Sequence, residues 1–198
     1  MDLKSNQLSA SDFEKIASLH CEYINQGFLA TLGIPFLTLL YEAIDNDSES
    51  ILLVERIDDT VQGFVTGTRG LGRIYMQLLY QPLRLLHSLK SCLLSPSKMH
   101  KIIEVLLLGN SSKASVDLPK HELLSIVVSS ACQGGGQSQN LFNALCDHFR
   151  KKNVRSFKIV VGGSLDRAHA FYIKMGCVPV KEVQVHKGTD SIIYIKEC

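Results

Sequence analysis

Hydrophobic and polar residues follow two alternating patterns in the last third of the chain. Residues 123–128 and 157–161 are continuous runs of mostly β-branched and other apolar residues, which predict two buried strands. Between them, apolar residues recur at spacings of three and four, which predicts one face of an amphipathic helix: Leu141, Phe142, Leu145, Cys146 and Phe149. Residues 180–186 and 192–196 predict a final hairpin. The pattern indicates an α/β fold.

The first 70 residues predict two helices followed by a strand pair. A helix starts near the Ser9–Asp12 segment, where polar residues precede an apolar repeat. Residues 28–44 predict a second, strongly apolar helix that is broken or begun at Pro35. Residues 50–57 and 61–68 predict two strands joined by a tight turn.

Residues 71–118 predict a helical insertion. Leucines and isoleucines from Ile74 to Leu93 predict one helix kinked near Pro82, and a second helix follows Pro96. The charge of this region is unusual, because residues 60–103 contain no acidic residue. They carry six of the 21 lysines and arginines: Arg69, Arg73, Arg84, Lys90, Lys98 and Lys101.

Length and composition are those of an ordinary globular protein. The chain has 198 residues, of which 45% are hydrophobic, so we expect residues 1–198 to form a single domain. No apolar run is long enough to span a bilayer, and no secretory signal is visible. The six cysteines form no metal-binding pattern, which favours reduced cysteines, a cytoplasmic location and no bound metal.

A glycine-rich turn separates the strand at 123–128 from the helix that follows it. Its glycines let backbone N–H groups converge on an anion, and the helix N-terminus adds partial positive charge. The spacing does not fit a nucleotide P-loop, which needs Gly-Lys-Ser/Thr, or a dinucleotide fingerprint, which needs a third glycine where Gln139 stands. We therefore predict a phosphate site of another kind, formed by Gln133, Gly134, Gly135, Gly136, Gln137 and Ser138.

This turn resembles the signature Gln/Arg-x-x-Gly-x-Gly/Ala of the GNAT acetyltransferase superfamily. Two further features strengthen the resemblance. Glu122 opens the preceding strand, where histone-type members carry a catalytic glutamate, and residues 168–176 are similar to the second conserved helix, with Ala168, Tyr172 and Gly176 in register. Leu165 and Cys177 depart from the family's usual Asn and Phe.

The resemblance implies a mixed, mostly antiparallel sheet flanked by helices and split to hold acetyl-CoA. The loop amides would bind the pyrophosphate, and Ser164 would supply the pantetheine hydrogen bond of the Asn that Leu165 replaces. The backbone of the splayed strand would pair with the pantetheine arm at Ile126, Val127 and Val128.

The resemblance also implies two catalytic residues. A lysine-like amine has a pKa of about 10.4, so a base must remove its proton at neutral pH. Glu122 is the candidate base, with Glu104 and His121 as weaker candidates; without the resemblance, Glu122 would be read as a solvated strand-end carboxylate. Tyr172 matches the tyrosine whose hydroxyl faces the leaving sulfur, which makes it the candidate general acid, although it could instead be a core residue.

The expected activity is direct transfer of an acetyl group to a primary amine of a small molecule. The basic region 60–103 favours an anionic acceptor such as a nucleotide-linked amino sugar, but a solvated helical pair or contact with a membrane surface would also account for it. Nucleic-acid binding is not expected, since aromatic interleaving is missing. A non-catalytic acyl-CoA-binding module is the alternative. The oligomeric state stays open, and a dimer is compatible with the sequence.

Overall fold

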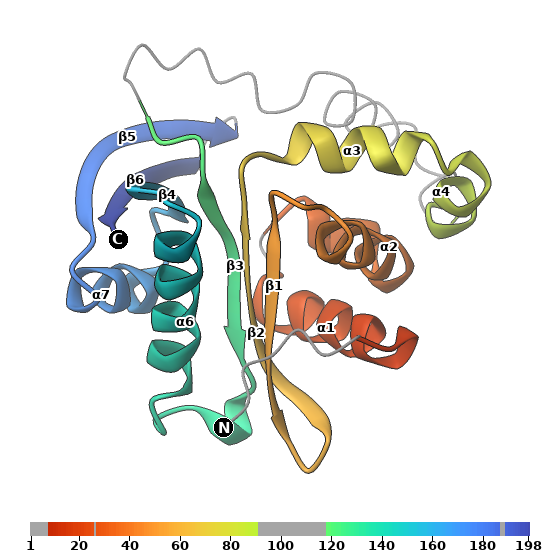
Figure 1. Ribbon diagram of the computed structural model, residues 1–198, viewed down its shortest axis with the longest axis horizontal. Coiled ribbons are helices and arrows are strands. Elements are labelled where there is room, and N and C mark those ends of the chain that lie inside the picture. Colours follow the sequence, from red (N-terminus) through yellow and green to blue (C-terminus); the bar gives the residue numbers. More distant parts are fainter. Residues whose placement is uncertain (1–7, 26, 91–117, 187–188) are drawn as a thin grey trace.

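A single six-stranded sheet forms the centre of the protein in a computed structural model that describes residues 8–25, 27–90, 118–186 and 189–198. The strand order is β1-β2-β3-β4-β6-β5 (Figure 1). Every neighbouring pair is antiparallel except β3–β4, which is parallel. The strands are β1 (Ile51–Ile57), β2 (Thr60–Thr68), β3 (Glu122–Val128), β4 (Ser156–Gly162), β5 (Val178–His186) and β6 (Thr189–Glu197). The sequence-based prediction of a mixed, mostly antiparallel sheet is confirmed.

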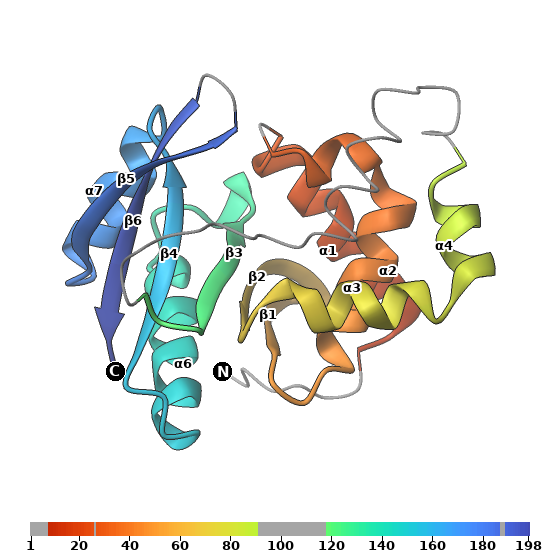
Figure 2. The ribbon, with the colours of Figure 1, turned by 90° about the horizontal axis from the view of Figure 1, so that it is seen from above.

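Helices cover both faces of the sheet and enclose a hydrophobic core on each (Figures 1 and 2). On one face lie α1 (Ala10–Tyr23), the short helix η1 (Leu29–Leu32) and α2 (Ile34–Asp45). On the other face lie α6 (Gln137–Lys151) and α7 (Asp166–Lys174). Close packing of α6 requires a glycine on β2, because a Cβ at Gly67 would lie 2.7 Å from the side chains of Leu145 and Phe149.

The helical insertion differs from its prediction. Instead of one helix kinked near Pro82, the structure has two separate helices, α3 (Leu71–Leu79) and α4 (Pro82–Ser88). Pro82 stands at the start of α4, where its missing N–H costs nothing. Leu83 and Leu86 are exposed rather than packed. The second predicted helix, after Pro96, lies outside the described residues.

The β3–β4 pair separates soon after it begins. The strands pair only at Glu122–Lys158 and Leu123–Ile159. At the same level, the β2–β3 register shifts between Thr66 and Gly67, which leaves Leu124 as an extra residue in a β-bulge. Bulges bend a strand and re-aim its side chains. The rest of β3 therefore diverges from β4.

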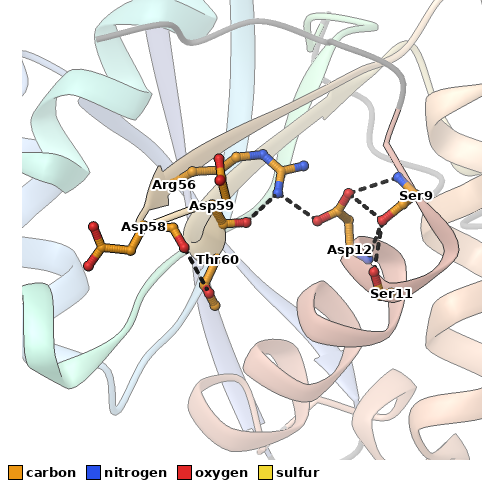
Figure 3. A network of polar contacts seen from close by, with 7 residues as sticks. All are labelled: Ser9, Ser11, Asp12, Arg56, Asp58, Asp59 and Thr60. Carbon is orange, nitrogen blue, oxygen red and sulfur yellow. Dashed lines mark hydrogen bonds and ion pairs between the residues drawn. The ribbon is translucent and has the colours of Figure 1, made fainter.

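A polar network holds the start of α1 against the β1–β2 turn (Figure 3). Ser9 and Asp12 form a capping box, in which each side chain binds the other residue's backbone N–H. Arg56 Nη1 donates to Asp12 Oδ1 at 2.7 Å and to the Asp59 carbonyl at 3.0 Å. The hydrogen bond from Arg56 holds the pKa of Asp12 well below its ordinary value.

This network leads to a prediction about acid stability. Because the folded-state pKa of Asp12 is depressed, its stabilisation is present above the ordinary pKa and disappears as the pH falls towards the folded-state pKa. Asp12→Asn should lower the free energy of unfolding by about 2 kcal/mol at pH 7, and this difference should shrink below about pH 4. Urea unfolding at several pH values measures it.

The matched control is Asp147→Asn. Asp147 pairs with Arg150 at a similar distance, 2.6 Å, but both side chains are 61% exposed. Exposed pairs contribute little to stability. An equal loss for the two variants, or a loss at Asp12 that did not depend on pH, would contradict the assignment.

Candidate active site

A cleft of about 670 Å³ opens where β3 and β4 diverge. Its walls include Leu123–Val128 of β3 and Ile159–Val161 of β4. On one face of the sheet the cleft reaches α7, and on the other it reaches Tyr23, Ile24 and Asn25 at the end of α1. The cleft is therefore accessible to groups from both faces of the sheet.

The glycine-rich turn lies at one end of this cleft and has the geometry expected of an anion site. Gly134 and Gly136 have φ values of 88° and 85°, which glycine adopts without strain. A Cβ at either glycine would meet no atom within 4 Å, so the space above the turn is open. Gly136 caps α6 without a side-chain hydrogen bond. The N–H groups of the first helical turn thus remain available to a ligand.

Most of the cofactor-binding residues predicted from the sequence lie together. Six of them line the cleft: Ile126, Val127, Val128, Gln133, Ser138 and Ser164. Gly134, Gly135, Gly136 and Gln137 are not in the cleft wall but form the turn that connects Gln133 to Ser138. Gln133 Nε2 donates to the Val128 carbonyl at 3.4 Å, which anchors the turn to the end of β3.

Tyr172 lines the cleft from α7 and is 6% exposed. Its ring packs among Phe142, Phe171 and Tyr194. Burial raises the pKa of Tyr172 well above its ordinary value, so the hydroxyl keeps its proton at neutral pH. Tyr172 is therefore a core residue that also forms part of the cleft wall.

Glu122 lies just outside the cleft, at the closed end where β3 and β4 still pair. Its carboxylate is 3.3 Å from Lys158 Nζ, and the two side chains are 15% and 23% exposed. Tyr75 of α3 is close by: burial, and secondarily the charge of Glu122, raise its pKa to about 12. Glu122 is thus one residue away from the cleft wall at Leu123.

The two weaker candidates for the base are not in this cleft. Glu104 lies outside the described residues. His121 lines a separate cleft of about 430 Å³ between the start of β3 and the end of α6. Burial, followed by the charge of Arg69, lowers the pKa of His121.

His169 supports the cleft rather than lining it. Its Nε2 lies 3.0 Å from the Gly162 carbonyl, which can only accept, so Nε2 carries the proton and donates. In the neutral ring, Nδ1 then accepts from the Tyr194 hydroxyl at 2.9 Å. His169 thereby fixes the turn that leads from β4 to Ser164.

Sequence reasoning missed three groups of cleft residues. Asp166 and Arg167 begin α7, and Arg167 brings a positive charge into the cleft wall. Tyr23–Asn25 come from the end of α1. Ser125, a polar residue inside the apolar run 123–128, also lines the cleft. Only Ser125 had a sequence signal, a polar residue at a buried strand position.

The described arginines of the basic region are paired with acidic side chains. Arg69 lies 3.4 Å from Glu49, Arg73 lies 3.1 Å from Asp47, and Arg84 lies 2.5 Å from Glu42. Each of the three arginine side chains is about half exposed. These contacts compensate the positive charge that the sequence places in this region.

The described residues contain no group of His, Cys, Asp or Glu arranged to hold a metal ion. Within the same residues, no helix combines the length and hydropathy that crossing a membrane requires.

Comparisons with known proteins connect this arrangement to one family. Residues 111–198 match the family model described as an acetyltransferase (GNAT) domain. No curated protein matches the chain with significant similarity.

Solved structures share the fold over nearly the whole chain. An aminoglycoside 6'-N-acetyltransferase complexed with coenzyme A has a TM-score of 0.60 at 12% identity, covering 99% of this chain and 95% of that one. PaiA N-acetyltransferase from Thermoplasma acidophilum, in complex with coenzyme A, has a TM-score of 0.60 at 14% identity, with 100% of both chains covered. NAA60 from Arabidopsis thaliana, in complex with acetyl-CoA, has a TM-score of 0.56 at 16% identity, covering 94% and 93%.

Proposed function

We propose that the chain is a member of the GNAT acetyltransferase superfamily, whose family model matches residues 111–198, and that it transfers an acetyl group from acetyl-CoA directly to a primary amine of a small molecule. The observation that carries this proposal is the cleft between diverging parallel strands, with an open glycine turn and a helix N-terminus at one end. The two features together suit a ligand that has an extended arm and a pyrophosphate.

In this proposal, acetyl-CoA lies along the cleft. The pyrophosphate binds the free N–H groups from Gly134 to Ser138, beside the positive end of α6. The pantetheine arm pairs with the backbone of Ile126–Val128, which β4 leaves unpaired. Ser164 and Arg167 lie on the opposite wall, where Arg167 can pair with a phosphate. The thioester then lies towards the closed end, near Leu123.

The chemistry needs a proton acceptor for the amine and a partner for the leaving thiolate. We assign the first role to Glu122, which lies next to the closed end and can reach the amine through a water molecule. We assign the second to Tyr172. Its raised pKa makes complete proton transfer to a thiolate of ordinary pKa, about 8.5, unfavourable. Tyr172 therefore acts by donating a hydrogen bond to the sulfur.

An anionic acceptor, such as a nucleotide-linked amino sugar, is the more specific form of the proposal. Its support is the charge of residues 60–103. The ion pairs of Arg69, Arg73 and Arg84 weaken this support, because their positive charge is already compensated by carboxylates. The primary amine is thus the feature of the acceptor that the proposal requires, and the anionic group is optional.

Isothermal titration of the purified chain with acetyl-CoA, coenzyme A and NAD tests the proposal. We expect binding of acetyl-CoA and coenzyme A with a Kd on the order of micromolar, about −8 kcal/mol, and no binding of NAD. Absence of acetyl-CoA binding would refute the proposal. Binding without release of free thiol across a panel of primary amines would instead indicate a non-catalytic acyl-CoA-binding module.

A further inference from the structure

A row of three polar side chains crosses the core from α1 to the cleft. His20 of α1, Tyr41 of α2 and Ser125 of β3 are 3%, 1% and 8% exposed. His20 Nδ1 lies 2.6 Å from the Tyr41 hydroxyl, and that hydroxyl donates to Ser125 Oγ at 3.5 Å. Ser125 is also part of the cleft wall. The row therefore connects the interior to the proposed reaction site.

At the end of this row that lies away from the cleft, one polar atom has no hydrogen bond. His20 Nε2 is buried and has no hydrogen-bond partner among the described residues. An unpaired buried polar atom opposes folding, and apolar side chains of the same shape would fill this place at lower cost. The core on this face is otherwise mainly apolar. Packing alone thus does not explain why a histidine and a tyrosine lead to Ser125.

The hydrogen bond in which the Tyr41 hydroxyl donates to Ser125 sets the direction that we assign to the protons of the row. Because Tyr41 donates to Ser125, its oxygen accepts from His20, so Nδ1 carries the imidazole proton. Ser125 Oγ accepts from Tyr41 and donates to no described residue, which leaves its own proton for the cleft. In this arrangement the hydrogen bonds from His20 and Tyr41 run towards Ser125, whose own hydroxyl is left to donate into the cleft, and each donor polarises the next.

The row carries no charge at neutral pH. Burial lowers the pKa of His20 to about 4 and raises the pKa of Tyr41 well above its ordinary value. Both groups are therefore neutral around pH 7. A neutral row of aligned donors stabilises negative charge that develops at its open end.

Ser125 and Tyr172 approach the cleft from opposite faces of the sheet. Ser125 is directed towards α2 because it follows the bulge at Leu124, whereas Tyr172 belongs to α7. The sulfur and the carbonyl oxygen of a thioester diverge by about 120° at the carbonyl carbon. A donor on one face of the sheet can therefore bind the sulfur, and a donor on the other face can bind the carbonyl oxygen.

We propose that Ser125, positioned by Tyr41 and His20, donates a hydrogen bond to the carbonyl oxygen of the bound thioester. This inference rests on the proposed function. As the amine nitrogen forms its bond to the carbonyl carbon, the C=O π electrons move to the oxygen, and the donor row stabilises this oxyanion. The electrons on the oxygen re-form the C=O π bond when the C–S bond breaks and the thiolate leaves. Ser125 is a catalytic residue in this scheme, and Tyr41 and His20 are positioning residues.

Infrared difference spectroscopy of bound acetyl-CoA, labelled with ¹³C at the carbonyl, tests the proposal without an identified acceptor. A hydrogen bond weakens the C=O bond and lowers its stretching frequency. We expect the frequency to be higher in Ser125→Ala than in the unaltered chain, and intermediate in Tyr41→Phe. Ser125→Thr, which keeps the hydroxyl, should restore the low frequency.

The control is Ser88→Ala. Ser88 is a similarly buried serine on α4, 5% exposed, whose hydroxyl donates to the Leu85 carbonyl at 2.8 Å. This variant should leave the carbonyl frequency unchanged. With any primary amine that shows turnover, Ser125→Ala should lower kcat about tenfold while the Kd for acetyl-CoA stays the same.

The outcomes separate this inference from the proposed function. If the unaltered chain binds no acetyl-CoA, the proposed function fails, and the inference fails with it. If acetyl-CoA binds and the carbonyl frequency is the same in Ser125→Ala, Tyr41→Phe and the unaltered chain, only the inference is overturned. Tyr41→Phe keeps the shape of the core residue, so it provides the test if Ser125→Ala does not fold.

Discussion

Replacing Gly136 with aspartate is expected to weaken acetyl-CoA binding strongly. A Cβ at Gly136 meets no atom within 4 Å, so the new side chain enters the open space where we place the pyrophosphate. At about 5 Å and an effective dielectric constant of about 20, each pair of like unit charges repels by about 3 kcal/mol. The affinity should therefore fall by about 100-fold or more. Isothermal titration with acetyl-CoA measures this loss.

Gly136→Asn is the matched control for charge. Asparagine has nearly the same shape as aspartate and, like it, tolerates the left-handed conformation that Gly136 adopts at φ 85°. The two variants should thus have similar melting temperatures, and Gly136→Asn should retain much more of the affinity. Equal losses in the two variants would show that shape, not charge, is decisive. Normal acetyl-CoA affinity in Gly136→Asp would refute the pyrophosphate site.

Glu122→Gln should lower the rate of acetyl transfer most strongly near neutral pH. Removing a general base costs about 10²- to 10⁴-fold. The amine acceptor is then mostly protonated in solution, because its pKa is about 10.4. As the pH rises towards that value, more free amine is present and the base is needed less. The ratio of the two rates should therefore decrease with increasing pH, as measured by kcat/KM from pH 6 to 10.

Lys158→Gln separates the base from the ion pair. It removes the partner that lies 3.3 Å from the Glu122 carboxylate but leaves the carboxylate itself. If Glu122 is the base, Lys158→Gln should reduce the rate much less than Glu122→Gln does. Similar losses for both variants would assign Glu122 to a structural ion pair. A Glu122→Gln profile parallel to that of the unaltered chain would exclude Glu122 as the base.

The sequence was sufficient where the information is local. Strands and helices follow from the two- and three-to-four-residue repeats, because each element must bury one face or stripe. The glycine turn was recognisable because Gly134 and Gly136 need φ values that other residues avoid. The break between α3 and α4 was misjudged as a kink. Proline is compatible with a kink and with a new first turn, and the local pattern does not distinguish them.

What the sequence determined by itself is therefore the order of elements, the glycine turn and the resemblance from which Glu122 and Tyr172 were selected. Only the tertiary structure decided that Glu122 lies beside the cleft rather than in its wall, and that Arg69, Arg73 and Arg84 are paired with carboxylates. It alone brought His20, Tyr41 and Ser125 together, across separations of 21 and 84 residues. Such contacts depend on the register of β3 and on its single bulged residue. A change in either moves the side chains that follow in the strand to the other face of the sheet.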